Sequence, residues 1–194
     1  SPSALNDYLR CPLLFYFKNI AGLREPDACD IDDNRLFGTI FHTTAELLYK
    51  NICNSEGIVT KEAIDNLLKD KFKNTIYRLI DEAFSKEIFR NRKPNYDGLQ
   101  LINREAISLY IIKLLKADIE IAPFKIVGLE TEVYENISFE VNGAPKDIII
   151  GGKIDRIDNI KGKDGKDSLR IVDYKTGVVT PKVMDDVASI FNPD

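Results

Sequence analysis

The stretch Arg170-Ile171-Val172-Asp173-Tyr174-Lys175-Thr176-Gly177 decides the fold of this chain. Its β-branched and aromatic residues are strand formers, and its final Thr-Gly pair marks the end of a strand. Side chains alternate along a strand, so Leu169, Ile171, Asp173 and Lys175 share one face. That face begins apolar and ends in two charges, whose burial costs free energy unless they bind something there.

A second stretch, Ile148–Asp158, lies upstream, and the polar, Gly-punctuated segment Lys161–Asp167 separates the two. We predict a hairpin centred on Asp164. In that register Asp155 lies directly opposite Asp173. Cross-strand neighbours have Cβ atoms roughly 4.5–5.5 Å apart, and like charges there repel each other.

Two facing carboxylates with Lys175 close by indicate a divalent-cation site with a lysine beside it. A slip of one residue would place Asp155 and Asp173 on opposite faces. The alternative is a solvated hairpin with Asp and Lys on its wet face. The apolar residues Leu169 and Ile171 on the same face favour the metal site over that alternative.

The length of 194 residues fits one domain with a real core, and 44% hydrophobic with 30% charged residues is ordinary for a globular protein. The net charge of −4 argues against a broad basic surface for nucleic acid, while it leaves room for a local one. The chain starts Ser-Pro-Ser rather than with Met, so we interpret it as a piece excised from a longer protein.

The cysteines Cys11, Cys29 and Cys53 are odd in number and show no CxxC spacing. This usage predicts a reducing, cytoplasmic location. We find no signal peptide and no apolar run long enough to cross a membrane, so no membrane partner is expected.

Hydrophobic periodicity predicts helices first and strands afterwards. Ser3 is the expected cap of the first helix, residues 22–33 are expected to form an exposed loop, and Asn142-Gly143 is expected to form a tight turn. The class is therefore α+β. The predicted helices are 4–10, 13–17, 34–54, 60–70, 71–90, 98–119 and 183–191, and the predicted strands before the hairpin centred on Asp164 are 125–135 and 137–141.

Four motifs appear in a fixed order along the chain. They are the amino-terminal S-x-S-x-L-x-x-Y-x-x-C-P pattern at Ser1–Pro12, the G-x-x-x-H helix at Gly38–His42, Gly152–Asp158, and Ile171–Gly177. Together they resemble the PD-(D/E)XK nuclease superfamily. The branch that they resemble is that of the RecB-like nuclease domains of helicase–nuclease repair enzymes, including AddB-type subunits.

The resemblance implies a restriction-endonuclease-like core, a small mixed β-sheet flanked by helices, with an N-terminal helical region. One domain would span residues 1–194, with a mainly helical part over 1–120 and the catalytic sheet and the start of a following helix over 121–194. It implies a metal-dependent DNA nuclease of repair and recombination, an exonuclease before an endonuclease. DNA and a helicase domain or subunit would be its partners.

The resemblance also assigns roles to single residues. Asp155 and Asp173 would be carboxylate ligands to Mg²⁺ or Mn²⁺, with the backbone carbonyl of Tyr174 as a further ligand. His42 would complete or orient the site. Lys175 would position the attacking water and stabilise charge on the phosphate. Oxygen ligands favour Mg²⁺, and a carboxylate-held metal supplies both the nucleophile and the counter-charge that hydrolysis needs.

Several residues keep two interpretations. Arg156 and Asp158 form structural or phosphate-facing pairs. Glu130 or Glu132 corresponds to the superfamily's upstream acid, but strand alternation does not choose between them. His42 is the only histidine, and a lone helical histidine is more often a satisfied core or surface residue than a ligand, so its role rests on the resemblance.

The chain also departs from its relatives. Some of them hold an iron–sulfur cluster through one early cysteine and three after the catalytic lysine. Cys11 matches the first position, but no cysteine follows Lys175, so such a cluster is not supported and Cys11 is interpreted as a buried thiol. The family's downstream Q-x-x-x-Y helix is not found in this chain, which puts the activity of this piece in doubt.

Two rival hypotheses remain. One is a catalytically silent domain of the same fold that binds DNA or a partner subunit. The other is a plain interaction domain with a chance D-x-K hairpin. A silent domain has no reason to keep charges that lower its stability, and the two acids, the lysine and the histidine are all present.

Overall fold

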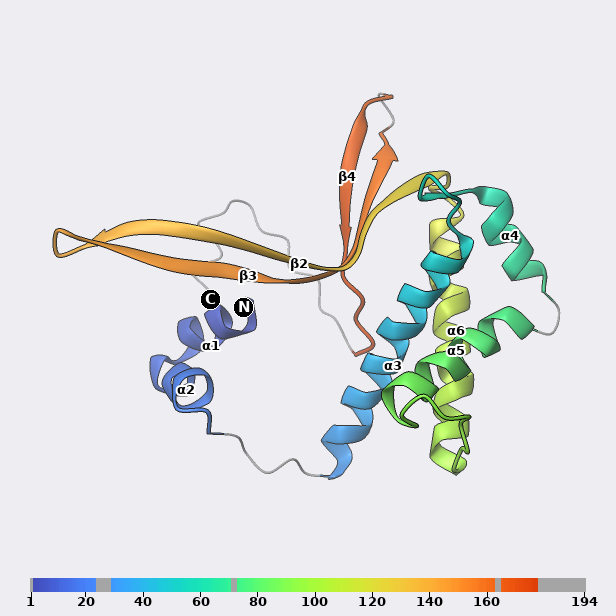
Figure 1. The fold of residues 1–194 in the computed structure, drawn as a ribbon, viewed down its shortest axis with the longest axis horizontal. Helices are drawn as coiled ribbons and strands as arrows, with labels where there is room; N and C mark the ends of the chain where they lie inside the picture. Colours follow the sequence, from blue (N-terminus) through green and yellow to red (C-terminus); the bar gives the residue numbers. More distant parts are fainter. Residues whose placement is uncertain (1, 24–28, 71–72, 163–164, 178–194) are drawn as a thin grey trace. The chain divides into compact units, whose positions relative to one another are not determined.

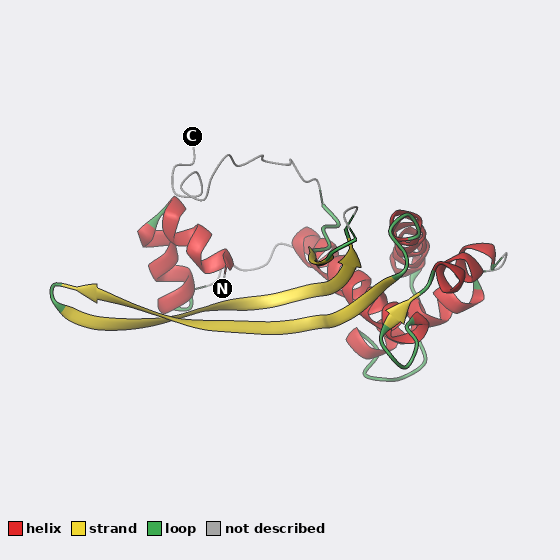
Figure 2. Ribbon diagram, turned by 90° about the horizontal axis from the view of Figure 1, so that it is seen from above, coloured by secondary structure: helices red, strands yellow, loops and turns green. Residues whose placement is uncertain are grey.

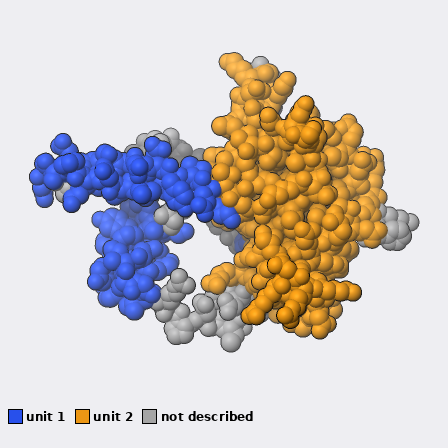
Figure 3. All heavy atoms as spheres, in the orientation of Figure 1, with its two compact units in different colours: residues 1–27, 132–153, 177–194 blue, residues 28–131, 154–176 orange. Residues whose placement is uncertain are grey.

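The computed structural model describes residues 2–23, 29–70, 73–162 and 165–177 (Figure 1). The chain forms two compact units, coloured separately in Figure 3. The larger comprises residues 28–131 and 154–176, and the smaller comprises 1–27, 132–153 and 177–194. The expectation of one domain over residues 1–194 stays a prediction. The helix expected over 183–191 lies outside the described residues.

The larger unit contains four helices in its described part, close to the predicted ranges: α3 (Cys29–Ile52), α4 (Lys61–Lys69), α5 (Asn74–Glu87) and α6 (Gly98–Asp118). The caps explain two of the starts. Thr60 accepts the amide of Ala63, and Asp97 forms a capping box with Gln100.

The prediction of a loop over residues 22–33 is wrong for its last part, because α3 already begins at Cys29. Three acids, Asp30, Asp32 and Asp33, made this segment resemble an exposed loop. Acidic residues are common in the first turns of helices in general, so these acids did not distinguish a loop from the start of a helix.

Helices α3, α5 and α6 pack together to form the core of this unit (Figure 1). On α6 the helical period buries Ile107, Ile111 and Leu115 on one stripe. Leu101 and Ile102 lie off that stripe and are exposed. On α3 the buried side chains include Phe41, Ala45, Leu48 and Tyr49, which places this helix at the centre of the unit.

Among the described residues, four strands form one sheet in the order β1-β2-β3-β4 (Figure 2). Their bounds are β1 (Ile58–Val59), β2 (Phe124–Val141), β3 (Ala144–Lys161) and β4 (Asp167–Val172). Strand β2 runs unbroken through the two ranges predicted for it. Strand β1 was not predicted, because two residues are too few to show alternation. The α+β class is confirmed.

The pairing of β3 with β4 confirms the predicted register. The strands are antiparallel, and their pairs run from Arg156↔Val172 to Lys161↔Asp167, all centred on position 164. Val172 faces the helices, whereas Leu169 and Ile171 are 70% and 67% exposed on the other face. Because β4 ends at Val172, the segment Asp173–Gly177 leaves the sheet directly after this pair.

The smaller unit contains α1 (Pro2–Arg10), α2 (Pro12–Phe15), the π-helix η1 (Tyr16–Ile20) and the outer part of the β2–β3 hairpin. The prediction of Ser3 as a helix cap is wrong, because α1 already begins at Pro2. A proline is tolerated in the first turn of a helix, where its missing N–H has no partner to lose.

The predicted tight turn at Asn142-Gly143 is confirmed. Both residues have positive φ, 53° and 75°, as a two-residue hairpin turn of type I′ requires. Ser138 donates to Asp147 across the strands at 2.6 Å, which fixes the register of this arm. One face of the arm is apolar and exposed, and its residues are Val133, Ile137, Phe139, Ile148 and Ile150.

Gly151→Ala is expected to destabilise the hairpin arm by about 1–3 kcal/mol, because overpacking against backbone forces the strands apart. An added Cβ would lie 2.8 Å from Tyr134 Cα and closer still to the Val133 carbonyl oxygen. Hydrogen exchange of the amides in residues 132–153 measures the effect. Gly98→Ala is the control, since nothing lies within 4 Å of a Cβ there. Equal protection in both variants would contradict the prediction.

Candidate metal centre

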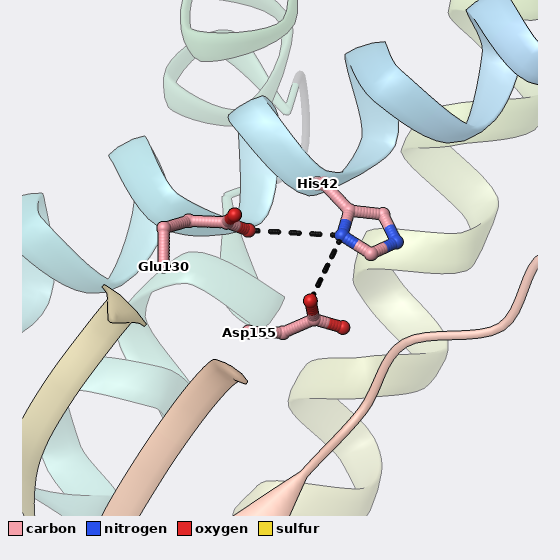
Figure 4. A group of neighbouring side chains, drawn as sticks. All are labelled: His42, Glu130 and Asp155. Carbon is pink, nitrogen blue, oxygen red and sulfur yellow. Dashed lines mark ion pairs between the residues drawn. The ribbon is translucent and has the colours of Figure 1, made fainter. Parts of the chain in front are cut away.

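Three side chains from three different elements converge in the larger unit (Figure 4). His42 comes from α3, Glu130 from β2 and Asp155 from β3. The Nδ1 atom of His42 lies 3.3 Å from Asp155 Oδ1 and 3.6 Å from Glu130 Oε1. One ligand atom from each residue lies within 4.8 Å of the other two, so the group can hold a metal ion.

The other imidazole nitrogen of His42 faces the segment after β4. His42 Nε2 lies 3.1 Å from the carbonyl oxygen of Tyr174. A carbonyl only accepts, so the Nε2 nitrogen carries the proton and donates it. The Nδ1 nitrogen of a neutral imidazole then presents a lone pair to two carboxylates. The Nδ1 atom and the two carboxylates thus form a set of ligand atoms to which a metal cation can bind.

Tyr174 is tied to this centre through both sides of its backbone. Its amide donates to Asp155 Oδ2 at 2.6 Å, while its carbonyl accepts from His42. Its ring is buried edge-on against Phe41 and His42, with centroids 5.7 and 5.6 Å apart. Burial raises the pKa of the Tyr174 hydroxyl above its ordinary value. The peptide group at Tyr174 is therefore held in one orientation.

Glu130 has an unusual backbone for a strand residue. Its φ of 49° lies in the left-handed region, which a glutamate adopts only at some cost in free energy. This local break in the alternation of β2 turns Glu130 toward His42 and Asp155. Glu132, the other acid left open by the sequence, is exposed and accepts from Tyr134. The structure therefore favours Glu130 as the upstream acid.

Asp173 and Lys175 lie outside the three-residue cluster. Their side chains are exposed and pair with each other, with Lys175 Nζ 2.9 Å from Asp173 Oδ2. The reason is the alternation of the extended segment, because Tyr174 between them points into the core. Of the residues assigned from the sequence, the structure brings together His42, Asp155 and Tyr174, and it leaves Asp173 and Lys175 on the adjoining surface.

Gly38 faces the same segment one turn before His42. A Cβ at this position would lie 3.5 Å from Thr176 Oγ1, an ordinary contact distance. A Cβ would therefore fit at this position, and the contact does not require a glycine. The Cys11 thiol is partly rather than fully buried, so the expectation of a buried thiol is not met.

Behind the centre lies a cluster of buried charges, which we call the Arg156 network and define as Tyr49, Asp118, Arg156, Asp158 and Arg170. The guanidinium of Arg156 is fully buried and bonds both carboxylate oxygens of Asp118 at 2.7 and 3.0 Å. Asp158 is fully buried too and accepts from Arg170. The structure therefore favours the structural role of Arg156 and Asp158 over the phosphate-facing one.

Burial has different effects on the charged groups of the network. Burial raises the pKa of Asp158 above its ordinary value, although Arg156 and Arg170 oppose that shift. Burial by itself would lower the pKa of Arg156. The hydrogen bonds that Arg156 donates to Asp118, and the electrostatic effect of the nearby Tyr49 and Tyr174, raise that pKa instead. Arg156 is therefore a permanent buried cation.

Comparison with known proteins agrees with this geometry. A sequence model of the PD-(D/E)XK nuclease superfamily matches residues 1–191. The chain is 28% identical over 191 residues to a subunit of the ATP-dependent helicase/deoxyribonuclease of Carboxydothermus hydrogenoformans, covering 93% of this chain and 16% of that protein. The subunits of the same name from Clostridium acetobutylicum and Acetivibrio thermocellus are 27% and 26% identical, each covering 91% of this chain and 15% of their own length.

The chain thus spans about one sixth of the length of these curated relatives. No solved structure matched it. None of the described helices is long and apolar enough to cross a membrane. The match runs through all four motifs and through the residues that converge at His42, and it confirms the resemblance to the AddB-type branch: the chain belongs to the PD-(D/E)XK nuclease superfamily.

Proposed function

We propose that this chain is the nuclease module of a helicase–nuclease and hydrolyses phosphodiester bonds of DNA with Mg²⁺ or Mn²⁺. The observation that carries the proposal is the arrangement at His42, whose Nδ1 lone pair and two carboxylates face one another while Nε2 is committed to Tyr174. A divalent cation resolves this conflict of acceptors, and metal-dependent hydrolysis is the chemistry that such a ligand set supports.

In this proposal His42, Glu130 and Asp155 hold the metal, and the Tyr174 carbonyl fixes the ring of His42. A metal held by these residues would lower the pKa of a bound water and so provide the nucleophile for hydrolysis. Asp173 and Lys175 lie on the surface next to the cluster, where they pair with each other. Asp173 would be a further carboxylate ligand of the metal, and the ammonium of Lys175 would stabilise the charge that develops on the phosphate.

The ligand set favours Mn²⁺ over Mg²⁺. Mg²⁺ requires near-ideal octahedral coordination by oxygen, whereas an imidazole nitrogen is a better ligand for a transition metal. We expect calorimetry to find tighter binding of Mn²⁺ than of Mg²⁺ by the wild-type chain. His42→Asn should weaken Mn²⁺ binding more than Mg²⁺ binding and so reduce the preference. Equal affinity of the wild type for the two ions would contradict a nitrogen ligand.

The substrate and partner are proposed from the relatives, whose names join a helicase to a deoxyribonuclease. Strand-break repair and recombination supply DNA ends, so exonuclease action is proposed before endonuclease action. With a net charge of −4, the chain neutralises few phosphates, and a helicase domain or subunit would deliver the strand. The reducing cytoplasm is the proposed compartment, and Cys11 and Cys53 are free thiols.

The test is cleavage of linear and circular DNA with Mg²⁺ or Mn²⁺, against EDTA. Degradation of linear DNA alone supports the exonuclease, and cutting of circles changes the class to endonuclease. If the chain binds Mn²⁺ and DNA but cuts neither form, the silent domain replaces our proposal. If the chain binds no divalent cation, the plain interaction domain is the hypothesis that replaces our proposal.

Lys175→Ala is expected to reduce cleavage by about 10²–10³-fold, the usual effect of removing one donor that stabilises transition-state charge. Mn²⁺ affinity should stay at the wild-type value, because the ammonium lies outside the ligand cluster. Single-turnover rates and calorimetry measure the two effects separately. Lys93→Ala, at an exposed lysine between α5 and α6, is the control. A parallel fall in metal affinity would contradict the assigned role.

A further inference from the structure

We infer that the Arg156 network is a positioning device that sets the geometry of the metal centre. The inference rests on the proposed function, since it concerns the site in which that function places the metal. No residue of the network is a ligand in the cluster of His42, Glu130 and Asp155. The network acts on that cluster through the contacts that join the two.

The charges of the network balance one another, two guanidinium groups against two carboxylates. Asp118 accepts hydrogen bonds from both terminal nitrogens of Arg156, from Arg170 at 3.2 Å and from the hydroxyl group of Tyr49. Asp158 lies 3.2 Å from Arg156 Nε and accepts from Arg170 Nε at 2.9 Å. Two guanidinium groups thus balance two carboxylates, and each group is held by at least two others.

Three connections lead from the network to the metal centre. Arg156 directly follows Asp155 on β3. Tyr49 lies two turns after His42 on α3, and its ring centroid lies 4.2 Å from the guanidinium carbon of Arg156. The same guanidinium carbon lies 5.8 Å from the ring centroid of Tyr174, whose backbone holds both Asp155 and His42. The network therefore contacts every element that carries His42, Asp155 or Tyr174.

Stability alone does not explain a buried ionic network at this place. Well-packed apolar residues of similar volume often give equal or greater stability. A planar guanidinium in a two-point bond to a carboxylate adds direction, because it tolerates neither rotation nor displacement. The fork between Arg156 and Asp118 thereby fixes β3 against the end of α6, and the stack on Tyr49 and Tyr174 fixes both rings. The positions of the metal ligands His42 and Asp155 follow from these contacts, because Asp155 precedes Arg156 and His42 bonds Tyr174.

The chain contains a matched fork away from the ligand cluster. Arg104 bonds Asp81 at 2.5 and 3.0 Å through Nε and Nη2, and its guanidinium carbon lies 4.3 Å from the Tyr77 ring centroid and 5.7 Å from that of Tyr96. Arg104 and Arg156 thus make the same kinds of contact. Only those of Arg156 lead to Tyr174 and Asp155.

The experiment compares Arg156→Lys with Arg104→Lys, and measures both the Mn²⁺ affinity of the folded protein and the stability of the metal-free protein. Lysine keeps the charge and loses the fork. We expect Arg156→Lys to weaken Mn²⁺ binding by about 10–100-fold, the usual effect of losing a group that orients a metal ligand. Arg104→Lys should leave Mn²⁺ affinity unchanged even though it lowers the unfolding midpoint.

Asp118→Asn, with Asp81→Asn as its control, is the second pair, because it preserves shape and keeps the test available if Arg156→Lys does not fold. Weaker Mn²⁺ binding in Asp118→Asn, together with wild-type Mn²⁺ affinity in its control Asp81→Asn, supports the inference. Wild-type affinity in folded Arg156→Lys or Asp118→Asn overturns it and leaves the proposed function intact. A wild-type chain that binds no Mn²⁺ overturns both. The wild-type measurement therefore separates the two failures.

Discussion

Asp155→Asn is expected to remove metal binding and cleavage together, each by at least about 100-fold. Losing a group that merely orients a ligand already lowers metal affinity by about 10–100-fold, and Asp155 lies in the ligand cluster itself. The asparagine oxygen can still accept the Tyr174 amide that Asp155 Oδ2 accepts. The metal-free variant should therefore fold, and its free energy of unfolding should lie within about 1 kcal/mol of the wild-type value, a change ordinary for a conservative substitution.

Thermal unfolding with and without Mn²⁺ measures this prediction directly. A metal that binds only the folded chain raises its stability by RT ln(1 + [Mn²⁺]/Kd), so the midpoint rises with concentration. We expect that rise in the wild type and its absence in Asp155→Asn. Asp147→Asn is the control, since Asp147 is an exposed acid bonded to Ser138 in the hairpin arm. A normal rise in Asp155→Asn would rule out Asp155 as a ligand.

Asp118→Ala is expected to lower the free energy of unfolding by about 3–5 kcal/mol, more than the other substitutions proposed for this chain, because it leaves a buried cation without its partner. Arg156 has no exposed surface, and both of its terminal nitrogens bond to Asp118. Water cannot replace those bonds without opening the core. Urea unfolding of the metal-free chain measures the change in the free energy of unfolding.

The comparison for that prediction is Asp81→Ala, which breaks the partly exposed fork with Arg104. The Arg104 guanidinium remains in contact with water, so the expected loss is only about 0–1 kcal/mol. The difference between the two variants isolates the effect of burial. Equal losses would show that Arg156 gains access to water and that the network is not sealed.

Much of the larger unit follows from sequence alone, and the reason is periodicity. A turn rich in Gly and Lys between two apolar runs fixed position 164 as the centre of symmetry, and the register of β3 and β4 follows from it. Long helices such as α6 repeat their apolar residues often enough to be recognised. The two residues of β1 and the acidic start of α3 carry no such repeat.

The site was predictable only where motif and regular backbone coincide. His42, Asp155 and Tyr174 lie on or next to regular elements and lie close together in the structure, whereas the metal-binding roles expected for them stay predictions. Strand alternation did not identify Glu130 as a site residue, because its positive φ interrupts the regular alternation of side chains along β2. Asp118 gave no signal at all, since a single aspartate at the end of a helix is ordinary until Arg156 is seen beside it.

The bond between His42 and the Tyr174 carbonyl joins residues 132 positions apart. A ribosome adds about 5–20 residues per second, so His42 waits roughly 7–26 s before its partner has been made. During that interval α3 can form and pack only with elements already synthesised. The three side chains of the cluster, His42, Glu130 and Asp155, are complete once residue 155 has been made, but the ring of His42 has no Tyr174 carbonyl to bind until the segment after β4 follows.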